Sequence, residues 1–360
     1  MRTIKNFNFD GQRVLVRCDF NAPLDKEGNI LDDFRIKQAV PTIQYLAKNG
    51  AKLILMSHLD GPGGTVKEEL RLTPIQNVLT KYLALPVIKV SDCLGKETES
   101  QIKEMQKGEI LLLENLRFYK GEEENSKEFA RELAKLGDIF INDAFGVCHR
   151  SHASITGLAE HLPAGAGFLL EKEVKILADL MENPLRPLVA IIGGKKAKNK
   201  TKVIEKILRV ADFVLIGHLI ENEIKEKVIF FENLPRDSQK IIVPLDSLGR
   251  DGRDLDIGPK TIKLFEEKIS QAGTIFWNGP LGMTEEKEFS NGSEKIAQAI
   301  VRSKSFSVVG GGETAEFVKR IGLEEEFSHL STGGGALLEF LAGEKLPGLE
   351  ALGYYENKKH

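Results

Sequence analysis

The chain has 360 residues, which at about 150 residues per domain predicts two domains, or three small ones. Its 50 Lys and Arg nearly balance its 53 Asp and Glu, and a formal net charge of −3 argues against a protein that captures nucleic acid or an anionic membrane by bulk charge. With 41% hydrophobic and 29% charged residues the composition is that of a globular chain, and it excludes collagen, a coiled coil or disorder as the main state.

The cysteines and the N-terminal residues indicate where the protein works. Cys18, Cys93 and Cys148 have neither the spacing of a disulfide framework nor that of a zinc site, which is typical of a reducing compartment. The first residues lack the apolar core of a secretory signal, and no apolar run is long enough to span a bilayer. We therefore expect a cytoplasmic protein with no membrane partner.

In the first half of the chain, short apolar runs typical of buried strands alternate with segments of helical spacing. The helical pattern that runs from Ile36 to Ala47 is expected to end at Gly50, and a later helix is expected to be capped by Asn125 or Ser126. The predicted strands of this half are 14–20, 52–58, 86–90, 109–115 and 139–145.

The second half repeats the alternation after a helical stretch at 167–182, which ends before a proline-containing segment at 183–187. Continuously apolar strands alternating with helices imply parallel sheets that are covered on both faces. Eleven strands are too many for one open sheet, so the predicted fold is α/β, with two doubly wound, Rossmann-like parallel-sheet domains joined by a helix. The predicted strands of this half are 188–193, 213–217, 240–244, 274–278, 306–309 and 327–330.

Four glycine-rich loops follow strands of the second half. In open parallel sheets, ligands bind beyond the carboxyl ends of the strands, where glycine permits close backbone approach and the next helix offers free N–H groups to phosphate. One such loop is most often only a turn, but four together favour a phosphorylated ligand. The chain has no P-loop, no dinucleotide fingerprint and no protein-kinase motif set. The loops are 191–196, 277–282, 308–315 and 331–336.

Cationic side chains gather at predicted strand ends and helix starts of the first half. A single arginine there is more often a solvated surface charge, and a single histidine is more often a satisfied polar residue. Together, guanidinium forks that bind carboxylate and phosphate predict a site for a small, doubly anionic metabolite. The residues are Arg35, His58, Arg117, Arg150 and His152, beside Asp19 and Asn21.

A lysine-rich segment at 193–206 contains six lysines. Such a run is usually a solvated helix face, and a nucleic-acid patch is a further reading. Because it begins directly after a strand and a Gly-Gly turn, we assign Lys196 and Lys200 to phosphate. The net charge and the lack of interleaved aromatic residues argue against nucleic acid.

An ordered set of motifs runs over nearly the whole chain: RCDFNAP (17–23), DDFRI (32–36), MSHL (56–59), ENLRF (114–118), NDAFGVCHRSHAS (142–154), DIGPKT (256–261), WNGPLG (277–282), GGGETA (310–315) and STGGGA (331–336). Taken together, these motifs resemble those of the phosphoglycerate kinase family. The resemblance implies phosphoryl transfer between ATP and the carboxylate of 3-phosphoglycerate, giving ADP and 1,3-bisphosphoglycerate, by a monomer that uses Mg²⁺. It also implies a phosphoglycerate-binding domain at 1–166 with 345–360, an interdomain helix at 167–182 and a nucleotide-binding domain at 183–344.

The resemblance also implies roles for individual residues. The attacking carboxylate is already ionised at neutral pH, so no general base is needed and catalysis rests on positioning and positive charge. The catalytic residues implied are Arg35, Lys196, Gly333 and Gly334. The substrate residues implied are Asp19, Asn21, Arg35, His58, Arg117 and Arg150. The nucleotide residues implied are Gly194, Lys196, Lys200, Gly217, Asn278, Glu285, Gly312, Glu313 and Thr314, with Glu313 as the metal ligand.

The chain departs from the family pattern in places. Gly61 stands where the family has an arginine, Glu313 replaces an aspartate, and the segment 216–222 replaces a glycine-rich adenine segment and is followed by a shortened region. These departures leave open an alternative, a catalytically weak or inactive homologue that binds nucleotide or phosphometabolite in a regulatory role. Retention of Arg35, Lys196 and Lys200 favours the kinase. We expect the protein to select weakly among nucleotide bases, so that its affinities for ATP and GTP differ by no more than about a factor of ten.

Overall fold

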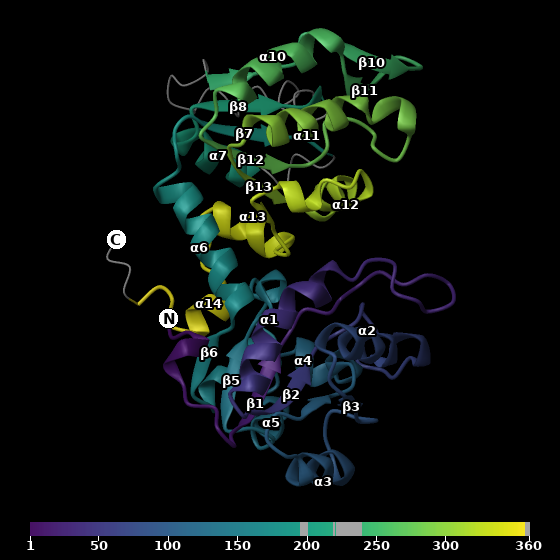
Figure 1. The fold of residues 1–360 in the computed structure, drawn as a ribbon, viewed down its shortest axis with the longest axis vertical. Coiled ribbons are helices and arrows are strands. Elements are labelled where there is room, and N and C mark those ends of the chain that lie inside the picture. The colour runs from purple at the N-terminus through teal and green to yellow at the C-terminus, as the bar shows by residue number, and fades with distance from the viewer. Residues whose placement is uncertain (195–200, 219, 221–239, 357–360) are drawn as a thin grey trace. The chain divides into compact units, whose positions relative to one another are not determined.

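The computed structural model describes residues 1–194, 201–218, 220 and 240–356. They form two compact units (Figure 1), which we call unit 1, Met1–Val174 with Lys345–His360, and unit 2, Lys175–Glu344. The chain passes from unit 1 to unit 2 within α6 (Phe168–Glu182), so the two units are joined by a helix, as predicted. Among the described residues, no helix has both the length and the apolar character needed to cross a membrane.

Unit 1 is built on a parallel sheet of six strands in the order β3-β4-β2-β1-β5-β6. The first strand of the chain is central, with later strands added on both sides of it. The strands are β1 (Arg13–Arg17), β2 (Lys52–Met56), β3 (Val87–Lys89), β4 (Ile110–Leu112), β5 (Ile139–Asn142) and β6 (Ala164–Ala166). The helices are α1 (Phe34–Lys48), α2 (Thr73–Leu83), α3 (Lys96–Glu104), α4 (Lys120–Glu123), α5 (Lys127–Ala134) and, near the C-terminus, α14 (Pro347–Ala351).

Successive residues of a strand point to opposite faces of the sheet, and helices cover the apolar side chains on both faces. Val14 and Val16 of β1 are packed in one core with α1 and α2. Leu15 lies between them in sequence and belongs to a second core, with Phe129 of α5 and Ile102 of α3. Strands buried on both faces are continuously apolar, which is why the sequence predicted them.

Two predicted helix boundaries agree with the structure. Gly50 follows α1 and adopts φ +77°, a backbone conformation that favours glycine over residues with a side chain. Ser126, one of the two predicted caps, accepts a hydrogen bond from the backbone N–H of Phe129 at 3.4 Å and begins α5.

Unit 2 has a second parallel sheet of six strands, in the order β14-β13-β12-β7-β8-β9. The winding reverses between β7 and β12, the switch point at which doubly wound sheets bind ligands. The strands are β7 (Leu188–Ile192), β8 (Phe213–Ile216), β9 (Ile241–Ile242), β12 (Thr274–Asn278), β13 (Phe306–Gly310) and β14 (His329–Leu330), and β10 (Ser247–Arg250) and β11 (Arg253–Ile257) form a separate antiparallel pair. The helices beyond α6 are α7 (Thr201–Val210), α10 (Pro259–Ser270), α11 (Asn291–Ser303), α12 (Gly312–Arg320) and α13 (Gly335–Leu341).

The fold therefore agrees with the predicted class, and two details differ. Strand β6 and the β10–β11 hairpin were missed, the first because Ala164–Ala166 (Ala-Gly-Ala) contains none of the β-branched or aromatic residues that mark a strand. The predicted runs 14–20 and 52–58 were also too long, since β1 ends at Arg17 and β2 at Met56. The residues beyond these ends form loops, and those loops carry the candidate site.

Candidate active site

The loop after β1 holds three of the predicted substrate residues together. Arg35, in the first turn of α1, donates from Nη1 to Asp19 Oδ2 at 3.1 Å and to the backbone oxygen of Asn21 at 3.3 Å. The side-chain oxygen of Asn21 accepts from the backbone N–H of Asp60 at 2.9 Å, which ties this loop to the loop after β2. Arg35 therefore has a fixed orientation, and its side chain stays partly exposed.

His58 lies in the loop after β2 and is held by an arginine that the sequence analysis did not single out. Arg17, fully buried in β1, donates from Nη2 to His58 Nδ1 at 3.1 Å. Burial, with help from the nearby Arg17 and Arg117 charges, lowers the pKa of His58 well below its ordinary value, so the ring is neutral. Since guanidinium nitrogens only donate, Nδ1 is the acceptor and the proton is on Nε2.

Arg17 is in turn anchored by a buried carboxylate. Its Nε donates to Ser154 Oγ at 2.8 Å, and Ser154 donates from Oγ to Glu122 Oε1 at 2.6 Å and from its backbone N–H to Glu122 Oε2 at 3.0 Å. Glu122 lies 4.0 Å from Arg17 Nη2, and burial raises the pKa of this carboxyl. His152 lies beside the same carboxylate, with Nδ1 3.9 Å from Oε1, and burial lowers its pKa to about 4.

Arg117 and Arg150 complete this cluster. Arg117 donates from Nη1 to the backbone oxygen of Asp60 at 2.7 Å, and its Nε lies 3.4 Å from Glu123 Oε1. Arg150 is exposed and donates from Nε to His149 Nε2 at 3.3 Å. Arg150 lies near enough to help lower the pKa of His152, so it belongs to the same electrostatic neighbourhood.

The structure therefore brings together the residues that the sequence predicted in unit 1. The members are Asp19, Asn21, Arg35, His58, Arg117, Arg150 and His152. Their guanidinium groups are charged while His58 and His152 are neutral, so the cluster offers cations and N–H donors. Such a set suits a small molecule that carries both carboxylate and phosphate.

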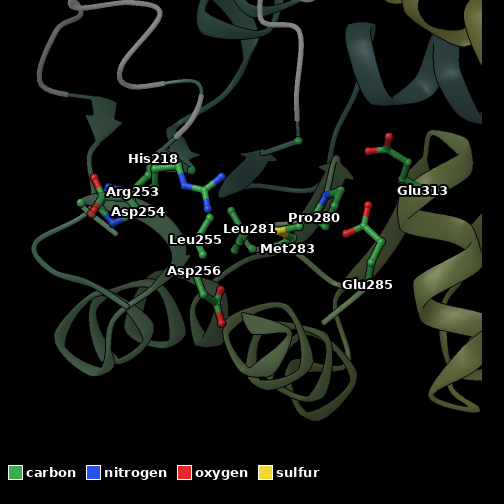
Figure 2. Close-up of a pocket in the computed structure, with 14 residues that line it drawn as sticks. His218, Arg253, Asp254, Leu255, Asp256, Pro280, Leu281, Met283, Glu285 and Glu313 are labelled. Atoms are coloured by element: carbon green, nitrogen blue, oxygen red, sulfur yellow. The ribbon is translucent and has the colours of Figure 1, made fainter. Parts of the chain in front are cut away.

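Unit 2 contains a pocket of about 530 Å³ beside its switch point (Figure 2). Its walls come from the loops after β7, β8 and β12, from the β10–β11 hairpin and from the start of α12. Its lining residues are Gly194, Gly217, His218, Gly252, Arg253, Asp254, Leu255, Asp256, Pro280, Leu281, Gly282, Met283, Glu285 and Glu313.

Backbone contacts between the loops after β7 and β12 shape this pocket. The N–H of Gly193 donates to the carbonyl of Asn278 at 2.9 Å, and that of Gly194 to the carbonyl of Pro280 at 2.7 Å. A Cβ on Gly193 would meet the Pro280 oxygen at 2.2 Å, so the two loops can lie this close only with glycine there. At Gly217 a Cβ would find ordinary contact distances, so that glycine is not required by packing.

The loops after β12 and β13 are joined by side chains predicted to bind nucleotide. Asn278 donates from Nδ2 to the carbonyl of Gly310 at 2.9 Å, and Thr314 Oγ1 accepts from the N–H of Gly279 at 2.7 Å. Gly312 and Glu313 occupy the first turn of α12, where backbone N–H groups have no partner within the helix. This turn suits an anion, and Glu313 is exposed beside it.

The fourth glycine-rich loop, 331–336, lies at the start of α13. Gly334 is its N-cap with φ +50°, and the N–H of Gly333 donates to Ser331 Oγ at 3.0 Å. Lys196 and Lys200 lie outside the described residues. Within the part of the chain that is described, no group of three or more His, Cys, Asp or Glu side chains could hold a metal ion by itself.

Two sets of residues were missed by the sequence analysis. Arg17 and Glu122 were missed because a buried ion pair between distant segments leaves no local signal, although Arg17 stands in a quoted motif. The hairpin residues Arg253, Asp254 and Leu255 were missed because no strand was predicted there. The Asp251-Gly252 dipeptide, a common hairpin turn, was the signal that could have found them.

Comparisons with known proteins agree over nearly the whole chain. A family model described as "Phosphoglycerate kinase" matches residues 4–228 and 224–344. A phosphoglycerate kinase of Dictyoglomus turgidum is 43% identical, with 97% of each chain covered, and one of Borrelia hermsii is 42% identical, with 98% of this chain and 99% of the relative covered. Among solved structures, phosphoglycerate kinase from Coxiella burnetii has a TM-score of 0.84 at 34% identity, with 98% of each chain covered. The enzyme from Pyrococcus horikoshii has a TM-score of 0.85 at 33% identity, with 99% of this chain and 100% of that chain covered.

Proposed function

The chain belongs to the phosphoglycerate kinase family, and from this premise we propose how its residues divide the work of phosphoryl transfer. The enzyme transfers a phosphoryl group between ATP and the carboxylate of 3-phosphoglycerate, giving ADP and 1,3-bisphosphoglycerate. The full-length relation to enzymes of this name carries that conclusion. No observation favours the alternative of a non-catalytic regulatory homologue.

The cluster of unit 1 is the proposed site for 3-phosphoglycerate. Arg35, Arg117 and Arg150 supply guanidinium groups for the carboxylate and the phosphate, and neutral His58 donates from Nε2. Asp19 and Asn21 hold Arg35 and the adjoining loops in place. The support for this assignment is that every cation of the cluster except the exposed Arg150 is oriented by a buried partner or a backbone oxygen.

The pocket of unit 2 is the proposed nucleotide site. Its apolar walls, formed by Pro280, Leu281 and Met283, suit a planar base, and the first turn of α12 suits phosphate. Glu285 is placed on the pocket wall where it could accept from ribose hydroxyls. Gly194 and Gly217 line the pocket, Asn278 and Thr314 join the loops beside it, and Gly312 lies in the first turn of α12. Lys196 and Lys200 are proposed from sequence alone.

The chemistry requires charge stabilisation rather than proton removal. A carboxylate oxygen of the substrate forms a bond to the γ-phosphorus while the bond from that phosphorus to the β–γ bridging oxygen breaks, and ADP leaves with the electron pair. Negative charge is then spread over the oxygens of the transferring group. We assign its stabilisation to Arg35, to Lys196 and to the loop at Gly333 and Gly334, where Gly334 supplies the backbone N–H, since that of Gly333 already donates to Ser331 Oγ.

A magnesium ion bound with the nucleotide fits the residues present. Mg²⁺ commonly takes one or two carboxylates and completes its shell with phosphate oxygens and water. The exposed Glu313 carboxylate in the first turn of α12 offers one such ligand. When bound, the ion supplies positive charge to the phosphate oxygens. Glu313→Gln should raise the Mg²⁺ concentration needed for activity, whereas Glu313→Asp should be tolerated. If Glu313→Gln needs no more Mg²⁺ than the wild type, a residue other than Glu313 is the magnesium ligand.

We also propose a cytoplasmic monomer. The three cysteines are free and buried, which fits a reducing compartment. Analytical ultracentrifugation tests the oligomeric state directly, and a dimer at micromolar concentration would contradict it.

The direct test of the function is a coupled assay for 1,3-bisphosphoglycerate. The purified chain is supplied with 3-phosphoglycerate, Mg²⁺ and ATP, GTP or ITP in parallel, and product formation is followed. Turnover that depends on both substrates supports the kinase. Nucleotide binding without any product over the same range would favour the regulatory homologue.

A further inference from the structure

The β10–β11 hairpin carries two arginines in paired positions with different surroundings. Arg250 ends β10 and Arg253 begins β11, and the two residues face each other across the register. Asp251 and Gly252 join them, with φ +55° and +73°, the conformation of a two-residue hairpin turn. The hairpin therefore presents two guanidinium groups from one short segment.

The Arg250 guanidinium group already has ionic and aromatic partners. Its Nη2 lies 2.8 Å from Glu288 Oε2 and 3.2 Å from Glu286 Oε2, and its guanidinium lies 5.0 Å from the centre of the Phe289 ring. Among the described residues, Arg253 has no hydrogen bond or ion pair through its side chain. It lines the pocket, and in Figure 2 its side chain extends into the space beside Leu255.

The other polar side chains of that end of the pocket already have partners. Asp254 Oδ1 accepts from Ser247 Oγ, and the Asp256 carboxylate accepts from the N–H groups of Gly292 and Ile257. His218 Nε2 lies 3.0 Å from the carbonyl of Asp246. Arg253 therefore supplies the donors that remain available to a ligand there, next to apolar walls that suit a flat ring.

We propose that Arg253 contacts the nucleobase and favours 6-oxopurines, guanine and hypoxanthine, over adenine. The inference rests on the proposed function, because it takes this pocket as the nucleotide site. A guanidinium group only donates, and guanine presents two adjacent acceptors, O6 and N7. Adenine has an amino donor in place of O6, which opposes a second guanidinium donor. Arg253 is thus a specificity-determining residue of the nucleotide pocket.

Direct binding of ADP, GDP and IDP by calorimetry, at one salt and one Mg²⁺ concentration, tests the proposal. In the wild type, GDP and IDP should bind at least as tightly as ADP. Arg253→Ala should weaken GDP and IDP binding by about fivefold or more, the lower end of what a bidentate base contact contributes, and leave ADP within about twofold. Arg253→Gln should shift the preference toward ADP, because an amide matches the N6 and N7 groups of adenine.

Arg250→Gln is the matched control, since it removes the same charge from the same hairpin away from the pocket. It should leave the ratio of GDP to ADP affinity unchanged. The proposal is overturned if Arg253→Ala leaves that ratio unchanged, or weakens all three nucleotides equally as a phosphate contact would. If the wild type is active with ATP and 3-phosphoglycerate and Arg253→Ala leaves the ratio of GDP to ADP affinity unchanged, only this inference is overturned. If the wild type binds none of the three nucleotides, the proposed nucleotide site is overturned as well.

Discussion

The candidate site of unit 1 and the candidate site of unit 2 are formed by different parts of the chain: side chains in the first and mainly backbone in the second. In unit 1 the site is a set of polar and charged side chains, supported by the buried Arg17, which donates to His58 and, through Ser154, is linked to the buried Glu122. In unit 2 the site is a pocket shaped mainly by backbone, with Gly193 and Gly194 bonded to the carbonyls of the facing loop. The first arrangement fixes the positions of charges, and the second fixes the shape of a cavity.

The difference fits the two ligands that we propose for these sites. A small metabolite with two anionic groups offers little apolar surface, so its recognition depends on oriented cations. A nucleotide offers a flat base and a chain of phosphates, so apolar walls and free N–H groups can recognise it. We therefore expect unit 1 to respond sharply to the loss of one charge, and unit 2 to respond mildly to the loss of one side chain.

Removing the buried guanidinium should have the largest effect. Arg17→Met leaves Glu122 as an uncompensated buried carboxylate, and loss of one partner of a buried pair typically costs about 3–5 kcal/mol of stability. Urea unfolding followed by circular dichroism measures this, because the single tryptophan, Trp277, lies in unit 2 and does not report on unit 1.

The double variant separates charge from packing. Arg17→Met with Glu122→Gln removes both charges, so it should recover part of the lost stability. A free energy of unfolding for Arg17→Met within about 0.5 kcal/mol of the wild type, the usual range for a surface substitution, would mean that the buried network does not hold the cluster in place.

Arg35→Ala should have the next largest effect, on activity. Loss of one donor to a transition-state oxygen commonly lowers kcat by about a hundred- to a thousandfold, and KM for 3-phosphoglycerate should rise as well. Steady-state kinetics with both substrates varied measures this effect. Arg131→Ala, which removes an exposed arginine of α5, is the control and should behave like the wild type. Ordinary kinetics for Arg35→Ala would remove this residue from the site.

The sequence predicted the sheets better than it predicted the cluster. Strands buried on both faces are continuously apolar, so β1, β2, β7 and β12 could be recognised from composition alone. The buried charges could not be recognised in this way, because Arg17 lies within such a strand, and its partners Ser154 and Glu122 come from segments more than a hundred residues away.

The β10–β11 hairpin of unit 2 shows a second reason why part of the structure could not be predicted from the sequence. Its strands lie largely at the surface, and Ser247–Arg250 is exposed along its whole length, so no apolar pattern marks it. The glycine loops were recognisable because a chain that must approach another backbone closely needs glycine. Gly193 meets that requirement, whereas Gly217 has room for a side chain.

Restoring the arginine that the family carries at position 61 should have a moderate effect. A Cβ on Gly61 meets no atom within 4 Å, and the adjacent Asp60 carbonyl already binds Arg117, so a new side chain fits beside the cluster. Gly61→Arg should tighten 3-phosphoglycerate binding by at most about ten- to a hundredfold, the range of one charge-assisted hydrogen bond. Gly61→Ala should show no gain. If calorimetry gives Gly61→Arg and Gly61→Ala the same affinity for 3-phosphoglycerate, this loop does not face the substrate.

The smallest expected effect is on the pH dependence of stability. The pKa of His152 is about 4 in the fold against an ordinary 6.5, so below pH 6.5 the unfolded chain takes up a proton that the folded chain refuses. The stabilisation is complete above pH 6.5 and is lost as the pH falls toward 4, by about 1 kcal/mol at most between pH 6.5 and 5.5. His152→Gln should flatten this part of the profile, and His161→Gln, an exposed control, should not. Parallel profiles for His152→Gln and the wild type would contradict the assignment.

The central claim is that unit 1 binds 3-phosphoglycerate and unit 2 binds the nucleotide through separate sets of residues. Titration calorimetry of Arg35→Ala and Glu285→Ala, each with 3-phosphoglycerate and with ADP, tests it most directly. We predict that Arg35→Ala weakens 3-phosphoglycerate by about tenfold or more and leaves ADP unchanged, and that Glu285→Ala weakens ADP and leaves 3-phosphoglycerate unchanged. Weakening of both ligands by either variant, or the reverse pattern, would contradict the account.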